Sequence, residues 1–150
     1  MQTNSKEQLV CIIRRADQDQ KSMLITFSDD KGKTWSKPFP MDNFGKLGVM
    51  PSITYLKCGI LILSYGRPGA WLSFSLNGIG KTWTKPICII KGKEGTHVER
   101  QEDTDGYTSI LLISDNSFLL AYTDFKFKDK KGNIRKAIIV RKVTVNKKIL

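Results

Sequence analysis

Phe27-Ser-Asp-Asp-Lys-Gly-Lys-Thr-Trp-Ser-Lys-Pro38 is repeated, with one inserted residue, by Phe74-Ser-Leu-Asn-Gly-Ile-Gly-Lys-Thr-Trp-Thr-Lys-Pro86. The hexamer Lys-Thr-Trp-Ser/Thr-Lys-Pro recurs 48 residues later. A second pair aligns without gaps at an offset of 57 residues, where Pro51–Tyr65 matches Thr108–Tyr122 at four identical positions. Repeats of this length indicate an array of similar structural units.

Short strands are the expected content of each unit. Runs of β-branched and aromatic residues are separated by Gly, Asn, Asp or Pro, and no stretch shows sustained helical periodicity. The runs are LVCII, SMLITFS, SITYL, ILILSY, AWLSFS, SILLI, FLLAYTDF and AIIVRKVTV. Sheet units of about 40–50 residues with a recurring turn and Trp are typical of β-propeller blades. The sequence predicts an all-β fold with at least eight strands, the first being Gln8–Ile13.

The length of the chain limits how much of a propeller it can form. Propellers use about 4–8 blades, whereas 150 residues make about three units of this size. Three blades cannot close a ring, and an open ring exposes strand edges. We therefore expect residues 1–150 to form a single incomplete propeller domain, part of a larger propeller or a truncated gene product.

The turn in the first repeat, residues 28–35, has a local physical explanation. The pattern is Ser28-x-Asp30-x-Gly32-x-Thr34-Trp35, which fits the Asp-box consensus. Asp30 can accept hydrogen bonds from its own turn, and Gly32 can adopt a left-handed φ. Trp35 is expected to pack beneath the hairpin and to be mostly buried.

The second box, residues 75–83, departs from this consensus. Its equivalents are Ser75, Asn77, Gly80, Thr82 and Trp83, with one extra residue between Ser and Trp. Asparagine can still form an Asx-turn. We predict the same hairpin with a looser tip and a mostly buried Trp83. Both boxes are interpreted as structural turns and not as calcium or sugar sites.

The chain is strongly basic, with a formal net charge of +11. Such a charge attracts anions: nucleic acid, anionic lipid or acidic sugars. No nucleic-acid motif accompanies it, so nucleic acid is not expected as a partner, and no apolar run approaches the ~20 residues of a membrane span. We expect the basic residues to form a solvated surface. Those in the C-terminal third are Lys126, Lys128, Lys130, Lys131, Arg135, Lys136, Arg141, Lys142, Lys147 and Lys148.

Metal chemistry and targeting have little support in the sequence. The single histidine, His97, is expected to be a loop residue, and the three cysteines lack clustered spacing, so no metal site is predicted. Cys11, Cys58 and Cys88 are expected to be buried, reduced thiols. The apolar run Leu9–Ile13 is too short for a signal-peptide core, and the sequence assigns no compartment.

Asp boxes within a propeller resemble the sialidase (neuraminidase) superfamily, whose repeats are also called BNR repeats. The resemblance covers roughly residues 8–145 and implies the C-terminal half of a six-bladed propeller, with N-terminal blades expected from missing sequence. It also implies retaining hydrolysis of terminal sialic acid from glycoconjugates, without metal or organic cofactor. The boxes specify the fold better than the activity, because folds host many functions.

Three residues match the family's functional positions. Gly106-Tyr107-Thr108 resembles the motif of the nucleophilic tyrosine. Arg67 stands where the third carboxylate-binding arginine is expected, and Arg14, preferred to Arg15 by strand register, where the second is expected. The first arginine, the activating glutamate and the acid/base aspartate would fall before Met1, so the isolated chain is expected to be inactive.

Simpler interpretations of these residues remain open. Tyr107 could be a strand aromatic in the propeller core. Arg67 could be a loop residue that pairs with a backbone carbonyl, and Arg14 could be an ordinary surface residue. The acidic stretch before Tyr107, formed by Glu99, Glu102, Asp103 and Asp105, is expected to be a solvated loop. The alternative function is a non-catalytic Asp-box propeller that binds glycans or a protein.

Overall fold

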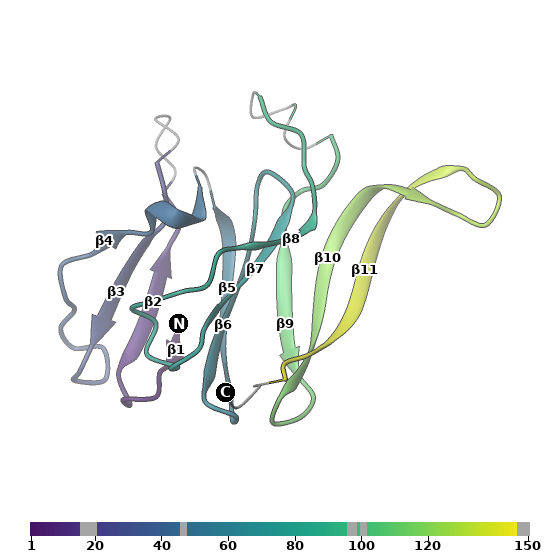
Figure 1. The fold of residues 1–150 in the computed structure, drawn as a ribbon. Coiled ribbons are helices and arrows are strands. Elements are labelled where there is room, and N and C mark those ends of the chain that lie inside the picture. The colour runs from purple at the N-terminus through teal and green to yellow at the C-terminus, as the bar shows by residue number, and fades with distance from the viewer. Residues whose placement is uncertain (16–20, 46–47, 96–98, 100–101, 147–150) are drawn as a thin grey trace.

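The computed structural model describes residues 1–15, 21–45, 48–95, 99 and 102–146. Within these ranges the chain forms eleven strands and one short 3₁₀ helix. The strands make three antiparallel sheets that follow one another along the chain (Figure 1). The predicted all-β class is confirmed.

The first sheet contains four strands in sequence order. They are β1 (Gln2–Thr3), β2 (Leu9–Ile13), β3 (Leu24–Ser28) and β4 (Phe39–Pro40), followed by η1 (Asp42–Phe44). The expectation that the chain begins with the strand at Gln8–Ile13 is wrong, because β1 pairs antiparallel with β2. The sheet therefore has a strand before LVCII that is too short to recognise from hydrophobic pattern.

The second and third sheets are also meanders, in which consecutive strands are neighbours. The second sheet has four strands: β5 (Val49–Leu56), β6 (Ile60–Gly66), β7 (Ala70–Ser75) and β8 (Ile87–Ile90). The third has three described strands: β9 (Thr108–Leu112), β10 (Ser117–Lys128) and β11 (Ile134–Thr144). The matching segments Pro51–Tyr65 and Thr108–Tyr122 thus form the first two strands of the second and third sheets.

The second sheet is the middle layer and is covered on both faces. Leu61, Leu63 and Tyr65 of β6 join a core with the first sheet. Ile62, between them in the alternation, joins a second core with the third sheet. Successive side chains of a strand point to opposite faces, so two covered faces explain why all of Ile60–Gly66 is buried.

Both Asp boxes lie at turns, as predicted. Each turn joins the third and fourth strands of its sheet. The expectation that both tryptophans are mostly buried is wrong for Trp35, which is 38% exposed. Trp83 is half-buried and packs edge-on against Phe44 of η1, with ring centroids 5.9 Å apart. The second box therefore lies against the first sheet, whereas the first box has no such neighbour among the described residues.

The cysteine prediction is corrected in one respect. All three thiols are free, but Cys88 is exposed and the other two are only partly buried. Cys88 lies in β8, the last strand of its sheet, where an edge position leaves its side chain accessible. Among the described residues, no helix is long and apolar enough to cross a membrane.

Candidate functional site

The predicted site residues lie at one end of the strands and the Asp boxes at the other. Arg14 follows β2, Arg67 follows β6 and Tyr107 precedes β9, at the upper end of the sheets in Figure 1. The two Asp-box turns lie at the lower end. We expected all three residues to lie at the ends of the innermost strands of their sheets. This expectation is corrected, because β2 and β6 are the second strands of their sheets and only Tyr107 adjoins a first strand, β9.

Two glycines bring the second and third sheets together at this end. A Cβ atom on Gly66 would overlap the carbonyl group of Gly106. Gly106 itself has φ 70°, and a Cβ atom there would lie 2.7 Å from the backbone nitrogen of Arg67. Close backbone approach and a left-handed φ both require glycine. Nearby, the hydroxyls of Ser64 and Thr108 lie 2.9 Å apart in hydrogen-bond contact.

Arg67 is held in a constrained conformation and is only 5% exposed. Its φ is 57°, a region that side chains rarely adopt. The backbone N–H donates to the Gly69 carbonyl at 3.1 Å, and the side-chain Nε donates to the Asp105 carbonyl at 3.1 Å. The second bond bears out the simpler interpretation that Arg67 pairs with a backbone carbonyl.

The terminal nitrogens of Arg67 have no protein partner among the described residues. Within the described part of the chain, neither nitrogen hydrogen-bonds to a protein group, and no carboxylate forms an ion pair with them. Neither is a fully buried, unsatisfied atom. A guanidinium whose two terminal nitrogens lack a protein partner can bind a carboxylate through two parallel hydrogen bonds.

Tyr107 lies directly beside this arginine. The Arg67 Cζ is 5.9 Å from the centre of the Tyr107 ring, within the range of a cation–π contact. Tyr107 is 46% exposed, so the interpretation of this residue as a core aromatic is wrong. In the described residues, no carboxylate hydrogen-bonds to its hydroxyl. The structure therefore brings together a buried cation and an accessible phenol.

The segment before Tyr107 is more ordered than a solvated loop. Asp103 is 9% exposed and Thr104 is fully buried. The Thr104 hydroxyl donates to the Thr123 carbonyl at 2.8 Å and accepts from the Gly106 N–H at 3.0 Å. Asp103 pairs with Lys126 of β10. Of the acidic stretch, Glu102 is exposed as expected, whereas Asp103 and Thr104 anchor the segment to the third sheet.

Arg14 stands apart from the other two residues. It is exposed just after β2 in the first sheet. Among the described contacts, no hydrogen bond or ion pair joins it to Arg67 or Tyr107. The structure brings Arg67 and Tyr107 together and leaves Arg14 at the same end of the strands without contact to them.

The first Asp box is closed by hydrogen bonds to a carboxylate. Asp30 accepts from the Ser28 hydroxyl at 2.8 Å and from the Thr34 N–H and hydroxyl at 2.8 and 2.5 Å. These bonds, led by the Thr34 hydroxyl, lower the pKa of Asp30 from 3.8 to about 2. Gly32 has φ 90° and its carbonyl accepts from Trp35 Nε1 at 3.1 Å.

The second box repeats this arrangement with a looser side. Gly80 N–H donates to Ser75 Oγ at 3.0 Å, and Trp83 Nε1 donates to the Gly80 carbonyl at 2.8 Å. Asn77 Nδ2 reaches the Thr82 hydroxyl only at 3.5 Å, against 2.5 Å between Asp30 and Thr34. Asn77 offers an amide N–H donor where Asp30 offers a charged acceptor, and a neutral hydrogen bond is longer than a charge-assisted one, which explains the looser tip.

The residue after each tryptophan also has a structural role that was not predicted from the sequence. Ser36 Oγ accepts from the Phe27 N–H at 3.1 Å, and Thr84 Oγ1 accepts from the Phe74 N–H at 3.1 Å. These hydrogen bonds continue the strand pairing where the chain leaves each Asp box. The signal was present in the repeated hexamer, whose fourth position is Ser or Thr.

The other missed residues are Gly66, Gly106, Thr104 and Asp105, which position Arg67 and Tyr107. A glycine directly precedes each of the two predicted site residues, and this was the available signal for the close approach of the two backbones. No signal in the sequence indicated the burial of Thr104, since this burial depends on contacts with the third sheet.

A separate groove of about 250 Å³ lies between the end of the first sheet and the second Asp box. Phe39, Phe44 and Trp83 line it together with the exposed Asp42 and Lys81. Neither Arg67 nor Tyr107 lines this groove. Within the described residues, no group of histidine, cysteine and acidic side chains could hold a metal ion. His97 lies outside the described residues.

Comparison with known proteins gives a fold relationship. No protein-family model matches the chain, and no curated protein matches it. A crystal structure of a protein of unknown function from Dyadobacter fermentans DSM 18053 is similar, with a TM-score of 0.55 and 20% identity. The similarity covers 96% of this chain and 40% of that protein. The chain thus spans 40% of the length of that relative, and the similarity concerns the fold.

Proposed function

We propose that the three sheets are blades of a sialidase-like six-bladed propeller and belong to its C-terminal half. The first strands support this, because β5 contacts both β1 and β9, whereas β3 and β4 of the first sheet and β10 and β11 of the third lie further from β5 (Figure 1). The third sheet also has exposed apolar residues on its edge strand β11, where Ile138 and Val140 are 75% and 57% exposed. Exposed apolar residues on an edge strand suit a neighbouring blade.

We further propose that Arg67 and Tyr107 bind the terminal acidic sugar of a glycoconjugate, sialic acid by resemblance. The contact between the Arg67 guanidinium, whose terminal nitrogens lack a protein partner among the described residues, and the exposed Tyr107 carries this proposal. A sugar carboxylate on Arg67 would place its ring beside Tyr107. Arg14 would contribute a second cation to the same end of the propeller, with further groups expected from N-terminal blades.

Hydrolysis with retention would proceed in two steps on this site. The Tyr107 oxygen attacks the anomeric carbon, its proton passes to a carboxylate, and a general acid protonates the departing glycosidic oxygen. Water then cleaves the tyrosyl–glycosyl bond, and the phenol regains its proton. A neutral phenol avoids repulsion by the substrate carboxylate, but with a free pKa near 10 it needs a base. Tyrosine is the known exception among retaining glycosidase nucleophiles.

A second candidate function is glycan binding without hydrolysis. It is favoured by one observation: within the described residues, no carboxylate contacts the Tyr107 hydroxyl. The two functions share Arg67 and differ in whether Tyr107 forms a covalent bond.

Binding of the α-methyl glycoside of sialic acid tests the shared part of the proposal. Calorimetry should detect binding that falls at least tenfold in Arg67→Gln. Arg141→Gln is a matched control, because Arg141 also stacks on a tyrosine, with its Cζ 5.6 Å from the Tyr122 ring. The neutral methyl ester of the same glycoside should bind weakly. Equal binding by wild type and Arg67→Gln would remove the proposal.

Turnover of a fluorogenic α-sialoside separates the two functions. The protein with its upstream blades should release the fluorophore, and Tyr107→Phe should reduce turnover by about 10²–10⁴-fold without weakening binding. Binding without turnover in the wild type would favour the non-catalytic function.

A further inference from the structure

The β10–β11 hairpin extends well beyond the rest of its sheet. β9 pairs only with residues 118–122 of β10. β10 continues to Lys128, and β11 begins at Ile134. Figure 1 shows the resulting two-stranded hairpin projecting from the end of the sheets that carries Tyr107. Residues 124–136 are here named the arm.

The arm is strongly basic. It contains six Lys or Arg residues and two Asp residues. Three of the cations, Lys128, Lys130 and Lys131, are exposed, and no carboxylate within the described residues pairs with their ammonium groups. The arm therefore presents positive charge that the protein itself does not neutralise.

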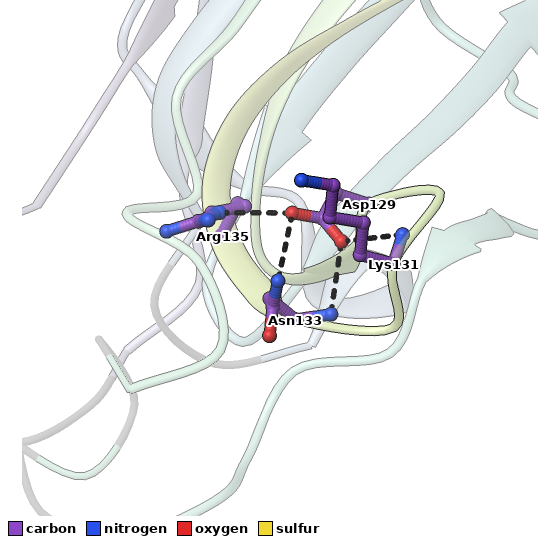
Figure 2. Close-up of polar contacts among 4 residues, drawn as sticks. All are labelled: Asp129, Lys131, Asn133 and Arg135. Atoms are coloured by element: carbon purple, nitrogen blue, oxygen red, sulfur yellow. Dashed lines mark hydrogen bonds and ion pairs between the residues drawn. The ribbon is translucent and has the colours of Figure 1, made fainter.

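The tip of the arm is an ordered turn (Figure 2). Asp129 accepts from the N–H groups of Lys131 and Asn133, each at 2.9 Å, and from Arg135 Nε at 3.1 Å. Gly132 has φ 81° within this turn. The Asp129 carboxylate is thus used inside the turn. The order of the turn reduces the entropy that a ligand must offset on binding.

The base of the arm is tied to the segment that carries Tyr107. The Phe125 N–H donates to the Asp103 carbonyl at 2.8 Å, and Lys126 pairs with the Asp103 carboxylate. Asp105, two residues further on, accepts from Arg67. The arm accordingly begins next to the Arg67–Tyr107 site and leads away from it.

We propose that the arm binds the polyanionic part of an acidic glycan chain whose terminal sugar occupies the Arg67–Tyr107 site. This inference rests on the proposed function for the identity of the ligand. Several uncompensated cations on a projecting hairpin match repeated carboxylates better than one terminal sugar. An anionic membrane fits less well, because the tip, Asp129-Lys-Lys-Gly-Asn133, has no apolar residue to insert. The exposed apolar residues of the arm, Phe127 and Ile134, lie in the two strands behind the tip.

Binding of α-linked polysialic acid to surface-immobilised protein tests the inference. The triple variant Lys128→Gln/Lys130→Gln/Lys131→Gln should weaken binding at least tenfold at low salt and flatten its dependence on salt, because fewer counterions are released. The control is Lys33→Gln/Lys37→Gln/Lys85→Gln, which removes the same charge from exposed lysines near the Asp boxes. An equal loss in both variants would show a nonspecific charge effect and overturn the proposal.

Two further measurements separate this inference from the proposed function. The α-methyl sialoside should bind equally to the arm variant and to the wild type, while Arg67→Gln should weaken its binding at least tenfold. If the monosaccharide fails to bind but the polymer binds through the arm, the proposed function fails and the arm remains an anion site. Arm-dependent binding to phosphatidylserine vesicles, without binding to polysialic acid, would overturn the assignment to a glycan.

Discussion

Gly66 and Gly106 lie backbone against backbone, so that a side-chain carbon on Gly66 would occupy the position of the Gly106 carbonyl. This contact joins the end of β6 to the segment before β9. Arg67 and Tyr107, the residues that follow each glycine, are consequently held side by side. The site therefore depends on the spacing between two sheets.

Gly66→Ala should separate the two sheets at this end. Because the neighbouring atoms are backbone and cannot rotate away, overpacking should destabilise the fold by about 1–3 kcal/mol or more. It should also weaken the sialoside binding proposed for Arg67 and Tyr107. Denaturant unfolding measures the first effect and calorimetry the second.

Gly132→Ala is the control for the glycine prediction. Gly132 has φ 81° but nothing within 4 Å of a Cβ atom, so it should lose only about 1–2 kcal/mol through backbone strain. Its sialoside binding should be unchanged. Similar loss of binding in both variants would contradict the role assigned to the contact.

Thr104→Val should disturb Tyr107 through a lost hydroxyl. The variant keeps the shape but leaves the Gly106 N–H without its acceptor, at a cost of about 1–3 kcal/mol. Thr104→Ser keeps the hydroxyl and should retain most of the stability and sialoside affinity. Chemical denaturation of the three proteins, with titration of the α-methyl sialoside, compares them directly. If Val and Ser behave alike, the hydrogen bond from Gly106 is unimportant.

Asp30→Asn should lower the melting temperature by a few degrees at neutral pH, because the amide cannot accept from both Thr34 groups. The pKa of Asp30 is lowered in the fold from 3.8 to about 2, so its stabilisation is present above pH about 4 and is lost as pH falls towards 2. The difference between wild type and Asp30→Asn should shrink over this window. Thermal melts from pH 2 to 7 test it, and a constant difference would show that the charge is irrelevant.

The two tryptophans of the repeat should differ in their contribution to stability. Trp83 packs on Phe44 in the core between the first two sheets, so Trp83→Ala should cost about 3 kcal/mol. Trp35 is 38% exposed, and Trp35→Ala should cost about 1 kcal/mol. Equal losses, measured by urea unfolding, would mean that the hairpin contact alone accounts for both residues.

The local structure of this protein was determined by its sequence. The turn residues of both boxes act over a few positions, since Asp30 and Asn77 bond within their own hairpins. Runs of β-branched and aromatic residues likewise predicted eight of the eleven described strands, but not β1, β4 and β8, which are only two to four residues long. Ser, Asp or Asn, Gly, Thr and Trp at nearly the same spacing therefore sufficed to place both turns.

The tertiary structure alone decided burial and the composition of the site. Trp35 and Trp83 have the same local sequence but different exposure, because only Trp83 meets η1 from another sheet. Arg67 and Tyr107 are 40 residues apart, and their contact depends on two glycines of different sheets. Burial and long-range contacts depend on how the sheets pack against one another. The residue pattern along one strand does not show which neighbouring element covers that strand.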